Sequence, residues 1–145
     1  MTEAADQADT DYRLDDQVGY LLRLASQRHA TIFQSKTING LTPTQFSALI
    51  RISEEGTCSQ NHLGRLAAMD VATIKGVVDR LRQKGLTVTA PDPNDKRRTM
   101  ISLSPEGEAM VAQMKEVGRE ITAESLKPLT AAEQRNLIKI LRKLS

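Results

Sequence analysis

The sequence of 145 residues predicts one mainly α-helical domain that carries a single small β-hairpin. Apolar residues recur at intervals of three and four along most of the chain, which is typical of amphipathic helices. Two short segments, 86–90 and 99–103, instead alternate with a period of two, as the strands of a hairpin do. Aromatic residues make up 3% of the chain, so the core is expected to be aliphatic.

The first helix is predicted to begin near Leu14, after an acidic stretch without apolar periodicity. Residues 1–11 are expected to form a flexible acidic tail, and residues 12–145 to form the domain. The mainly apolar face of this helix is formed by residues spaced by three and four positions. They are Leu14, Val18, Leu21, Leu22, Ala25, His29 and Ile32. The helix is expected to end near Asn39 and Gly40, two residue types that adopt left-handed backbone conformations.

Each of the next three helices has a clear start signal. Their predicted N-cap residues are Thr42, Ser59 and Asp70. Pro43 suits the first helical position of the first of them, and Gln45 completes a capping box with the N-cap threonine. Gly85 is expected to end the last of the three, immediately before the hairpin.

Two more helices are predicted after the hairpin. One begins at Ser104-Pro105-Glu106, and the other begins with a capping box of Thr130 and Glu133. Their apolar stripes are Met110, Met114, Val117 and Ile121 in the first, and Leu137, Ile138, Leu141 and Leu144 in the second. The stripes can pack within the chain or form a dimer interface. We favour the interface, because three helices outside a compact unit have few other surfaces to cover.

Basic charge is concentrated in one part of the chain. Residues 59–98 carry eight basic and four acidic residues, whereas residues 1–16 carry one basic and six acidic residues. The chain as a whole has 20 Lys and Arg against 18 Asp and Glu, so its net charge alone implies no nucleic-acid partner. Within a predicted DNA-binding lobe of residues 41–103, residues 58–103 combine two short helices, a tight turn and a hairpin with a basic tip. This order predicts a winged helix-turn-helix that binds double-stranded DNA, flanked by dimerisation helices in 12–40 and 104–145.

The second helix of this motif is the predicted recognition helix. On a helical wheel of residues 71–84, the predicted buried face consists of Ile74, Val77, Val78 and Leu81. The residues expected to contact DNA from its exposed face are Ala72, Thr73, Lys75, Gly76 and Arg80. Glycine costs about 1 kcal/mol relative to alanine in a helix, so Gly76 indicates a close approach of DNA or is an ordinary solvent-facing glycine. Ser59 and Gln60 begin the preceding helix and are expected to face a phosphate, although Ser59 also serves as an N-cap.

The hairpin tip holds Asp95, Lys96, Arg97 and Arg98. Three consecutive cations repel one another and do not suit a core, whereas a narrow minor groove has the negative potential that attracts them. Asp95 is expected to hold one arginine through a bidentate pair. The alternative is a solvated charge cluster.

These motifs resemble those of the MarR family of winged-helix transcription regulators, over essentially the whole chain. The matching segments are LTPTQFSAL, LGRLAAMDVATIKGVVDRLRQKGL and DPNDKRRTMISLSPEG. The resemblance implies a homodimer on a pseudo-palindromic operator, with Arg97 in the minor groove and Asp95 as its partner. Lys96 and Gly76 both stand where arginine is common in the family, and Lys75 is the residue expected to compensate at the recognition helix. The segment CSQNHLGRLAAMDVATIKGV also resembles regulators of nicotinate breakdown within the family.

The resemblance further implies a repressor that is released by a small aromatic acid or phenol. Arg23 and His29 are the candidate effector-binding residues, and their alternatives are a solvated surface arginine and a histidine with a satisfied ring. A regulator or activator that is ligand-independent or responds to cysteine oxidation remains open. Cys58 would be its sensor, because a helix N-terminus next to it lowers a thiol pKa; simple packing is the other interpretation.

Other classes of protein lack support in the sequence. The chain has a single cysteine and so cannot form an internal disulfide, which fits a protein of a reducing compartment. No apolar run approaches the ~18 residues of a membrane span, and the acidic N-terminus is unlike a secretory signal, so we expect a cytoplasmic protein without membrane contact. His29 and His62 lack clustered ligands, so no metal or other cofactor is expected. No catalytic motif is present, so the protein is not expected to be an enzyme and has no predicted catalytic residue.

Overall fold

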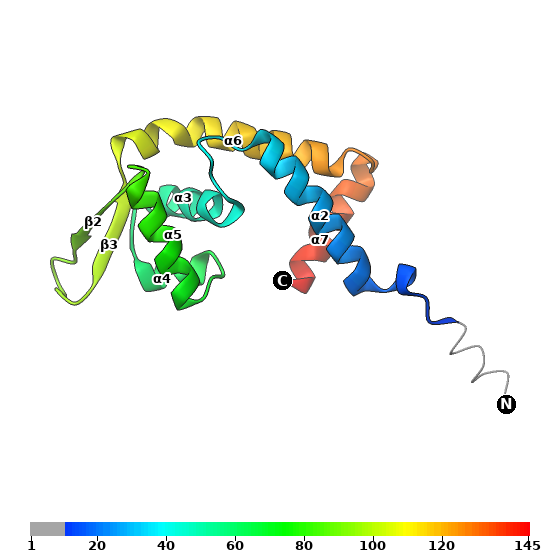
Figure 1. The fold of residues 1–145 in the computed structure, drawn as a ribbon, viewed down its shortest axis with the longest axis horizontal. Helices are drawn as coiled ribbons and strands as arrows, with labels where there is room; N and C mark the ends of the chain where they lie inside the picture. The colour runs from blue at the N-terminus through cyan, green and yellow to red at the C-terminus, as the bar shows by residue number, and fades with distance from the viewer. Residues whose placement is uncertain (1–10) are drawn as a thin grey trace, which may run out of the picture. The chain divides into compact units, whose positions relative to one another are not determined.

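The computed structural model describes residues 11–145 (Figure 1). A 3₁₀ turn, η1, spans Leu14–Asp16. The α-helices are α2 (Val18–Lys36), α3 (Pro43–Glu55), α4 (Gln60–Leu66), α5 (Val71–Gln83), α6 (Pro105–Leu126) and α7 (Ala131–Leu144). The strands are β1 (Thr57–Ser59), β2 (Thr87–Pro91) and β3 (Thr99–Leu103). The predicted fold class, mainly α with a small hairpin, is confirmed.

The chain forms two compact units, each described by itself. The winged unit is Lys36–Glu120 and contains α3, α4, α5, all three strands and most of α6. The helical unit combines residues 11–35 with Ile121–Ser145, within the part of the chain that the structure describes. Apart from Asp11, the tail expected at residues 1–11 lies outside the described residues.

The helix starts form by the side-chain caps that the sequence predicts. Thr42 Oγ1 accepts a hydrogen bond from the Gln45 N–H, and Gln45 Oε1 accepts one from the Thr42 N–H, both at 3.3 Å. Asp70 Oδ1 accepts from the Thr73 N–H at 2.7 Å. Each bond satisfies one of the backbone donors that a helix start leaves without a partner, so local sequence alone fixes where these helices begin. Ser59 and the pair Thr130 and Glu133 cap α4 and α7 in the same way.

The first helix differs from the sequence prediction. It begins at Val18 instead of Leu14, because Gln17 has an extended backbone that separates α2 from the 3₁₀ turn. It ends at Lys36, and the left-handed turn at Asn39 and Gly40 follows, with φ angles of 53° and 63°.

The sheet has the order β1-β3-β2, and both pairings are antiparallel. In the predicted hairpin Val88 lies opposite Ser102, and Thr57 of β1 lies opposite the same residue on its other edge. Sequence analysis missed β1, because three residues are too few to show an alternating pattern. Its partner strand is distant in the chain, so the pairing depends on the tertiary fold.

The core of the winged unit is aliphatic, as expected. Its buried members are Leu41, Ala48, Leu49, Ile52, Cys58, Leu63, Ile74, Val77, Val78, Leu81, Leu86, Ile101 and Met114. Met114 is fully buried in this cluster, and Met110 packs against it. The assignment of Met114 to a dimer interface is therefore wrong, and Met110 is partly covered by the same cluster. The part of α6 up to Glu120 belongs to the winged unit, and its apolar side is covered within the chain.

Gly107 marks a close approach between the start of α6 and the hairpin. A Cβ atom at this position would lie 2.2 Å from the Leu86 carbonyl oxygen. Ser104 reinforces the junction, because its Oγ donates to the Gly85 carbonyl at 2.6 Å and accepts from the Gly107 N–H at 3.0 Å. Only glycine fits here without moving backbone.

Gly107→Ala is expected to lower the free energy of unfolding by about 2 kcal/mol, the usual cost of forcing extra volume into packed structure. Urea denaturation followed by circular dichroism measures it. Gly19→Ala is the matched control, because nothing lies within 4 Å of a Cβ at Gly19 in α2. Alanine there should be neutral or stabilising. Equal stability of the two variants would show that the α6 junction tolerates a side chain.

Candidate nucleic-acid interface

Helix α5 buries the face that the wheel predicts. Ile74, Val77, Val78 and Leu81 are its buried residues. Ala72, Thr73, Lys75 and Arg80 are exposed, and Gly76 is half-buried. The predicted DNA contacts of this helix therefore lie on its solvent side, where they are accessible to a partner.

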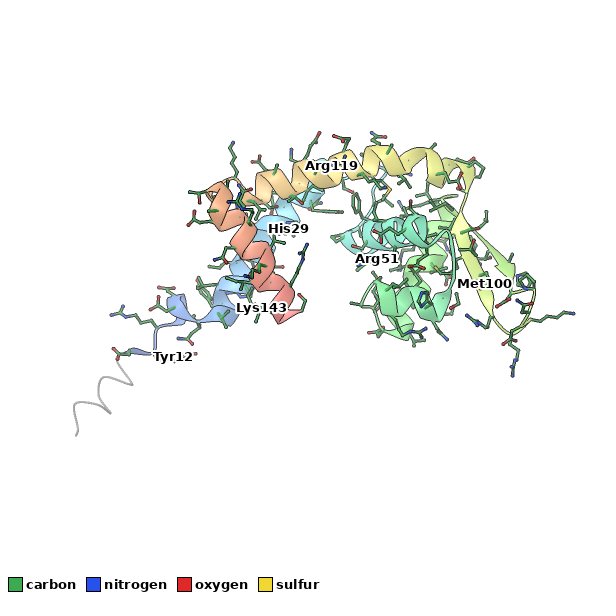
Figure 2. The ribbon with its side chains drawn as sticks, turned by 180° about the vertical axis from the view of Figure 1, so that it is seen from behind. Tyr12, His29, Arg51, Met100, Arg119 and Lys143 are labelled. Atoms are coloured by element: carbon green, nitrogen blue, oxygen red, sulfur yellow. The ribbon has the colours of Figure 1, made fainter. Side chains whose placement is uncertain are left out.

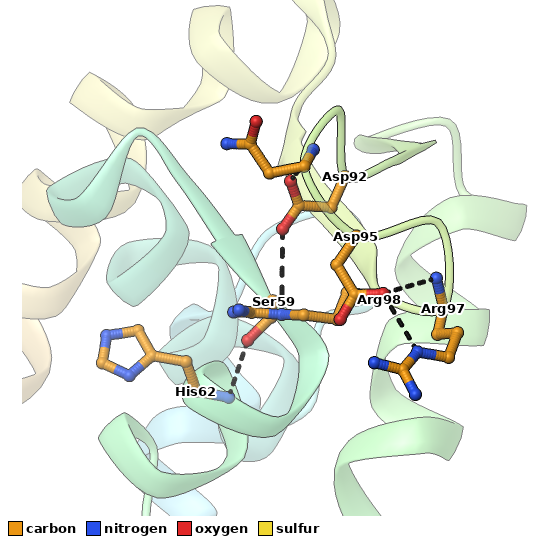
Figure 3. A network of polar contacts seen from close by, with 7 residues as sticks. Ser59, His62, Asp92, Asp95, Arg97 and Arg98 are labelled. Carbon is orange, nitrogen blue, oxygen red and sulfur yellow. Dashed lines mark hydrogen bonds and ion pairs between the residues drawn. The ribbon is translucent and has the colours of Figure 1, made fainter.

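The wing tip orients Arg97 through Asp95 (Figure 3). Asp95 Oδ1 accepts hydrogen bonds from the Arg97 backbone N–H at 3.1 Å and from Arg97 Nε at 3.2 Å. These bonds to Arg97 hold the pKa of Asp95 below its ordinary value. The Arg97 side chain is 91% exposed, so the contact positions it without burying it.

The expected bidentate pair between Asp95 and Arg97 is wrong in its geometry. One carboxylate oxygen accepts both bonds, and the arginine uses its backbone N–H and its Nε. The two residues are only two positions apart in a tight turn, so the arginine stem faces the carboxylate. No side chain of residues 11–145 accepts a hydrogen bond from the terminal Nη1 and Nη2 groups, so their donors are available for a partner.

The neighbouring cations have different surroundings. Arg98 Nε lies 3.8 Å from Asp92 Oδ2, and Asp92 also accepts the Asn94 N–H at 2.9 Å. Lys96 has no acidic partner within residues 11–145. The tip thus carries three cations and two carboxylates, and each carboxylate fixes one arginine in place.

A groove of about 450 Å³ joins the wing to the start of α4. Its lining residues are Ser59, Gln60, Asn61, Arg65, Arg97, Arg98 and Thr99. Three arginines therefore meet at one surface depression, together with four uncharged polar side chains. Such a surface suits an anionic backbone, because guanidinium groups form charge-assisted hydrogen bonds to phosphate.

Ser59, Gln60, Arg97 and Arg98 of this groove are predicted DNA contacts, whereas Asn61, Arg65 and Thr99 are not predicted from the sequence. Asn61 and Arg65 are four residues apart on α4, so they share a helix face. That spacing was a visible signal, but the side on which the wing lies is decided by the tertiary fold. Ser59 Oγ is occupied as the N-cap, since it accepts from the His62 N–H at 3.2 Å.

Cys58 lies in the core and does not have the properties of a redox sensor. It is buried within β1, opposite Ile101. Burial raises the pKa of its thiol, and the nearby Glu55 carboxylate raises it further. The expectation that the following helix start would lower this pKa is wrong, because desolvation of the thiolate outweighs it. The thiol stays protonated at neutral pH and unreactive.

In the helical unit, Arg23 and His29 are both exposed and both have intrachain contacts. Figure 2 labels His29. The Arg23 guanidinium lies 5.4 Å from the centroid of the Tyr20 ring. His29 Nδ1 is hydrogen-bonded to Ser125 Oγ at 2.9 Å. Their role in effector binding stays a prediction.

Arg28, which sequence analysis missed, caps the end of α6. Its guanidinium donates to the carbonyls of Ser125 at 2.7 Å and Glu124 at 2.9 Å. These carbonyls belong to the last turn of α6, which has no intrahelical donors left for them. Nothing in the local sequence around Arg28 indicates this contact, because the two segments are distant in the chain.

No group of three or more His, Cys, Asp or Glu side chains in residues 11–145 is arranged to hold a metal ion. Within the same part of the chain, no helix has both the length and the apolar character that a membrane crossing needs.

A helix-turn-helix with a basic wing defines the winged helix-turn-helix class of DNA-binding proteins. Comparison with known proteins places the chain within that class. The MarR family model matches residues 41–99. The chain is 38% identical over 136 residues to the HTH-type transcriptional repressor NicR of Pseudomonas putida, covering 93% of this chain and 86% of that protein. The chain therefore belongs to the MarR family of transcription regulators, as the resemblance of its motifs implies.

Two solved structures extend this result. A probable transcriptional regulator from Pseudomonas aeruginosa is 51% identical, with a TM-score of 0.89 and coverage of 92% of this chain and 100% of that one. BpsR of Bordetella bronchiseptica, whose DNA binding is regulated by 6-hydroxynicotinic acid, is 36% identical, with a TM-score of 0.86 and coverage of 92% and 96%. These similarities agree with the predicted likeness to regulators of nicotinate breakdown.

Proposed function

We propose that this protein is a homodimeric repressor that binds a pseudo-palindromic operator and leaves it when a small aromatic acid binds. The groove that brings Arg65, Arg97 and Arg98 together carries the proposal, because it is a polycationic surface beside an exposed recognition helix. The similar protein NicR is a transcriptional repressor. We place this function in the cytoplasm, where DNA and a reducing environment for Cys58 are found, and we infer no enzymatic activity.

On the DNA, α5 enters the major groove with Ala72, Thr73 and Lys75 toward the bases, because that groove admits a helix and distinguishes all four base pairs. The wing tip then lies at the adjacent minor groove, where Arg97 meets the most negative potential. Lys96 and Arg98 contact the flanking phosphates. Residues 41–103 act as the DNA-binding lobe.

The dimer is supported by apolar side chains that the helical unit leaves uncovered. Exposed members on α2 and α7 are Val18, Leu21, Leu22, Leu24, Ile138, Ile140, Leu141 and Leu144. Exposed apolar patches of this kind usually mark an interaction site. A second copy of the chain is the partner that also suits a palindromic operator, with recognition helices about 34 Å apart. The dimerisation helices are then supplied by residues 12–35 and 121–145, the part of the predicted segments 12–40 and 104–145 that belongs to the helical unit.

Binding to DNA from the region upstream of the protein's own gene is expected to weaken steeply with salt. Each neutralised phosphate releases counterions, so affinity should fall by about a thousandfold between 50 and 200 mM salt if six or more phosphates are contacted. Fluorescence anisotropy with labelled DNA measures this. An affinity that is independent of salt would contradict the proposal that DNA is the partner.

6-Hydroxynicotinic acid is expected to release the protein from the operator, with Arg23 and His29 supplying positive charge and a hydrogen-bond donor for its carboxylate. Arg23→Ala and His29→Ala should raise the concentration needed for release by about tenfold without changing operator affinity. A mobility-shift titration with nicotinic and benzoic acids as comparison ligands measures this. Insensitivity to all three acids would favour a ligand-independent regulator or activator. Release unchanged in both variants would remove these residues from the site.

A further inference from the structure

The exposed surface of α5 consists of two stripes with different electrostatics. Lys75, Asp79 and Arg82 form the first stripe, at spacings of four and three. Lys75 Nζ lies 3.4 Å from Asp79 Oδ2, and Arg82 Nη2 lies 3.5 Å from Asp79 Oδ1. Both cations of this stripe therefore have a carboxylate partner within the helix.

Thr73, Gly76 and Arg80 form the second stripe, at spacings of three and four. Arg80 is exposed, and no carboxylate of residues 11–145 forms an ion pair with it. A Cβ atom at Gly76 would stand 3.1 Å from Arg80 Nη1. The Arg80 guanidinium therefore lies across Gly76, in the space that any other residue would fill with a side chain.

This arrangement moves the guanidinium toward the N-terminal half of the helix. Long side chains on a helix lean back over the preceding turn, and Gly76 removes the obstacle on that path. Recognition helices contact base edges mainly through their N-terminal residues. The Arg80 guanidinium thus reaches the part of α5 that is proposed to enter the major groove, although the Arg80 Cα lies about one helical turn beyond Gly76.

The two stripes also differ in what a base contact would cost. Lys75 would have to leave Asp79 to reach a base, whereas Arg80 has no ion pair within residues 11–145 to give up. A guanidinium presents a planar pair of donors that matches the O6 and N7 acceptors of guanine, and an ammonium presents a point charge. The structure therefore favours Arg80 over Lys75, the residue that sequence analysis expected to compensate for the absence of arginine at position 76.

We propose that Arg80 reads a guanine in each operator half-site, and that Gly76 is the positioning residue that lets its guanidinium lie across the helix. This proposal rests on the proposed function, since it names the base that the same surface recognises. Gly76 then has a specific role in recognition, and its low helix propensity is the consequence.

The test compares the affinities of Arg80→Ala, Arg80→Lys and Gly76→Ala for an operator and for its single base-pair variants. At one symmetry-related pair of G·C positions, the wild-type protein should prefer G·C over the other base pairs. Arg80→Ala and Arg80→Lys are both expected to reduce that preference at least tenfold. Gly76→Ala should lose discrimination at the same positions. It should have no further effect in an Arg80→Ala background, because the two residues act through one contact. Arg82→Ala is the matched control, because it removes a cation of the same helix that is paired with Asp79, and it should keep the preference of the wild-type protein.

A uniform loss of affinity across all variants of the operator would show that Arg80 contacts phosphate and would overturn the proposal. Additive effects of Gly76→Ala and Arg80→Ala would overturn the positioning role. Failure of the wild-type protein to bind any DNA would instead refute the proposed function. Thermal unfolding of each variant checks its fold, and Gly76→Ala should be at least as stable as the wild type, because alanine favours the helix.

Discussion

Arg97→Ala is expected to weaken operator binding by more than tenfold while the dimer persists. Arg97 is held by Asp95 through two bonds to one carboxylate oxygen, with its terminal donors exposed. A dimer inserts two such side chains, and a tenfold loss corresponds to about 1.4 kcal/mol. Fluorescence anisotropy gives the affinity, and analytical ultracentrifugation gives the oligomeric state. Unchanged operator affinity would contradict the assignment of Arg97 to the minor groove.

Two further variants at the wing tip distinguish the effect of removing a positive charge from the effect of losing the orientation of Arg97. Lys96→Ala should reduce affinity a few-fold and make it less sensitive to salt, because Lys96 is proposed to contact phosphate. Asp95→Ala removes the residue that orients Arg97 and should cost affinity although it makes the wing more basic. The lowered pKa of Asp95 means that this contact is complete above the ordinary pKa of a carboxyl group. It is lost as the pH falls through the lowered value.

The double variant Ile138→Glu, Leu141→Glu is expected to be monomeric and to lose operator affinity by at least about a hundredfold. The two residues are 36% and 37% exposed in the chain, and thermal unfolding of the variant checks that the fold of one copy is kept. In a dimer they would place carboxylates in an apolar interface, which is strongly unfavourable. A monomer also loses the gain from engaging two half-sites at once. Sedimentation velocity measures the first effect, and fluorescence anisotropy the second.

Lys139→Glu is the matched control for this variant. Lys139 lies between the two apolar positions and is exposed, and its replacement adds the same negative charge on the neighbouring face of α7. It should remain dimeric. A dimeric double variant would show that α7 lies outside the interface, and the exposed apolar residues of α2 would then be the remaining surface.

The short elements of the winged unit were predictable because their signals are local. Thr42, Asp70 and Ser59 each accept a hydrogen bond from a backbone N–H a few residues ahead. Such bonds depend on residue type and spacing, which the sequence displays directly. The same holds for the buried face of α5, where helical periodicity alone orders the residues.

Features that join distant segments were not predictable in this way. The stripe of α6 was visible, but the sequence does not say whether Met110 and Met114 meet a second chain or the core of their own. Cys58 follows the same logic, because its pKa depends on burial beside β3 and not on the helix start that follows it. Arg28 capping α6 and Arg65 joining the wing arginines are further contacts of this kind.

The sequence by itself determined the helix starts, the hairpin, the basic tip and the MarR-type motif of this protein, because each depends on neighbours within a few residues. The tertiary structure decided which apolar stripe is core, which arginines share a groove and how the charges of α5 are paired. On α5, Asp79 pairs with both Lys75 and Arg82, four and three residues away. Arg80 forms no ion pair within residues 11–145, and its guanidinium lies over Gly76.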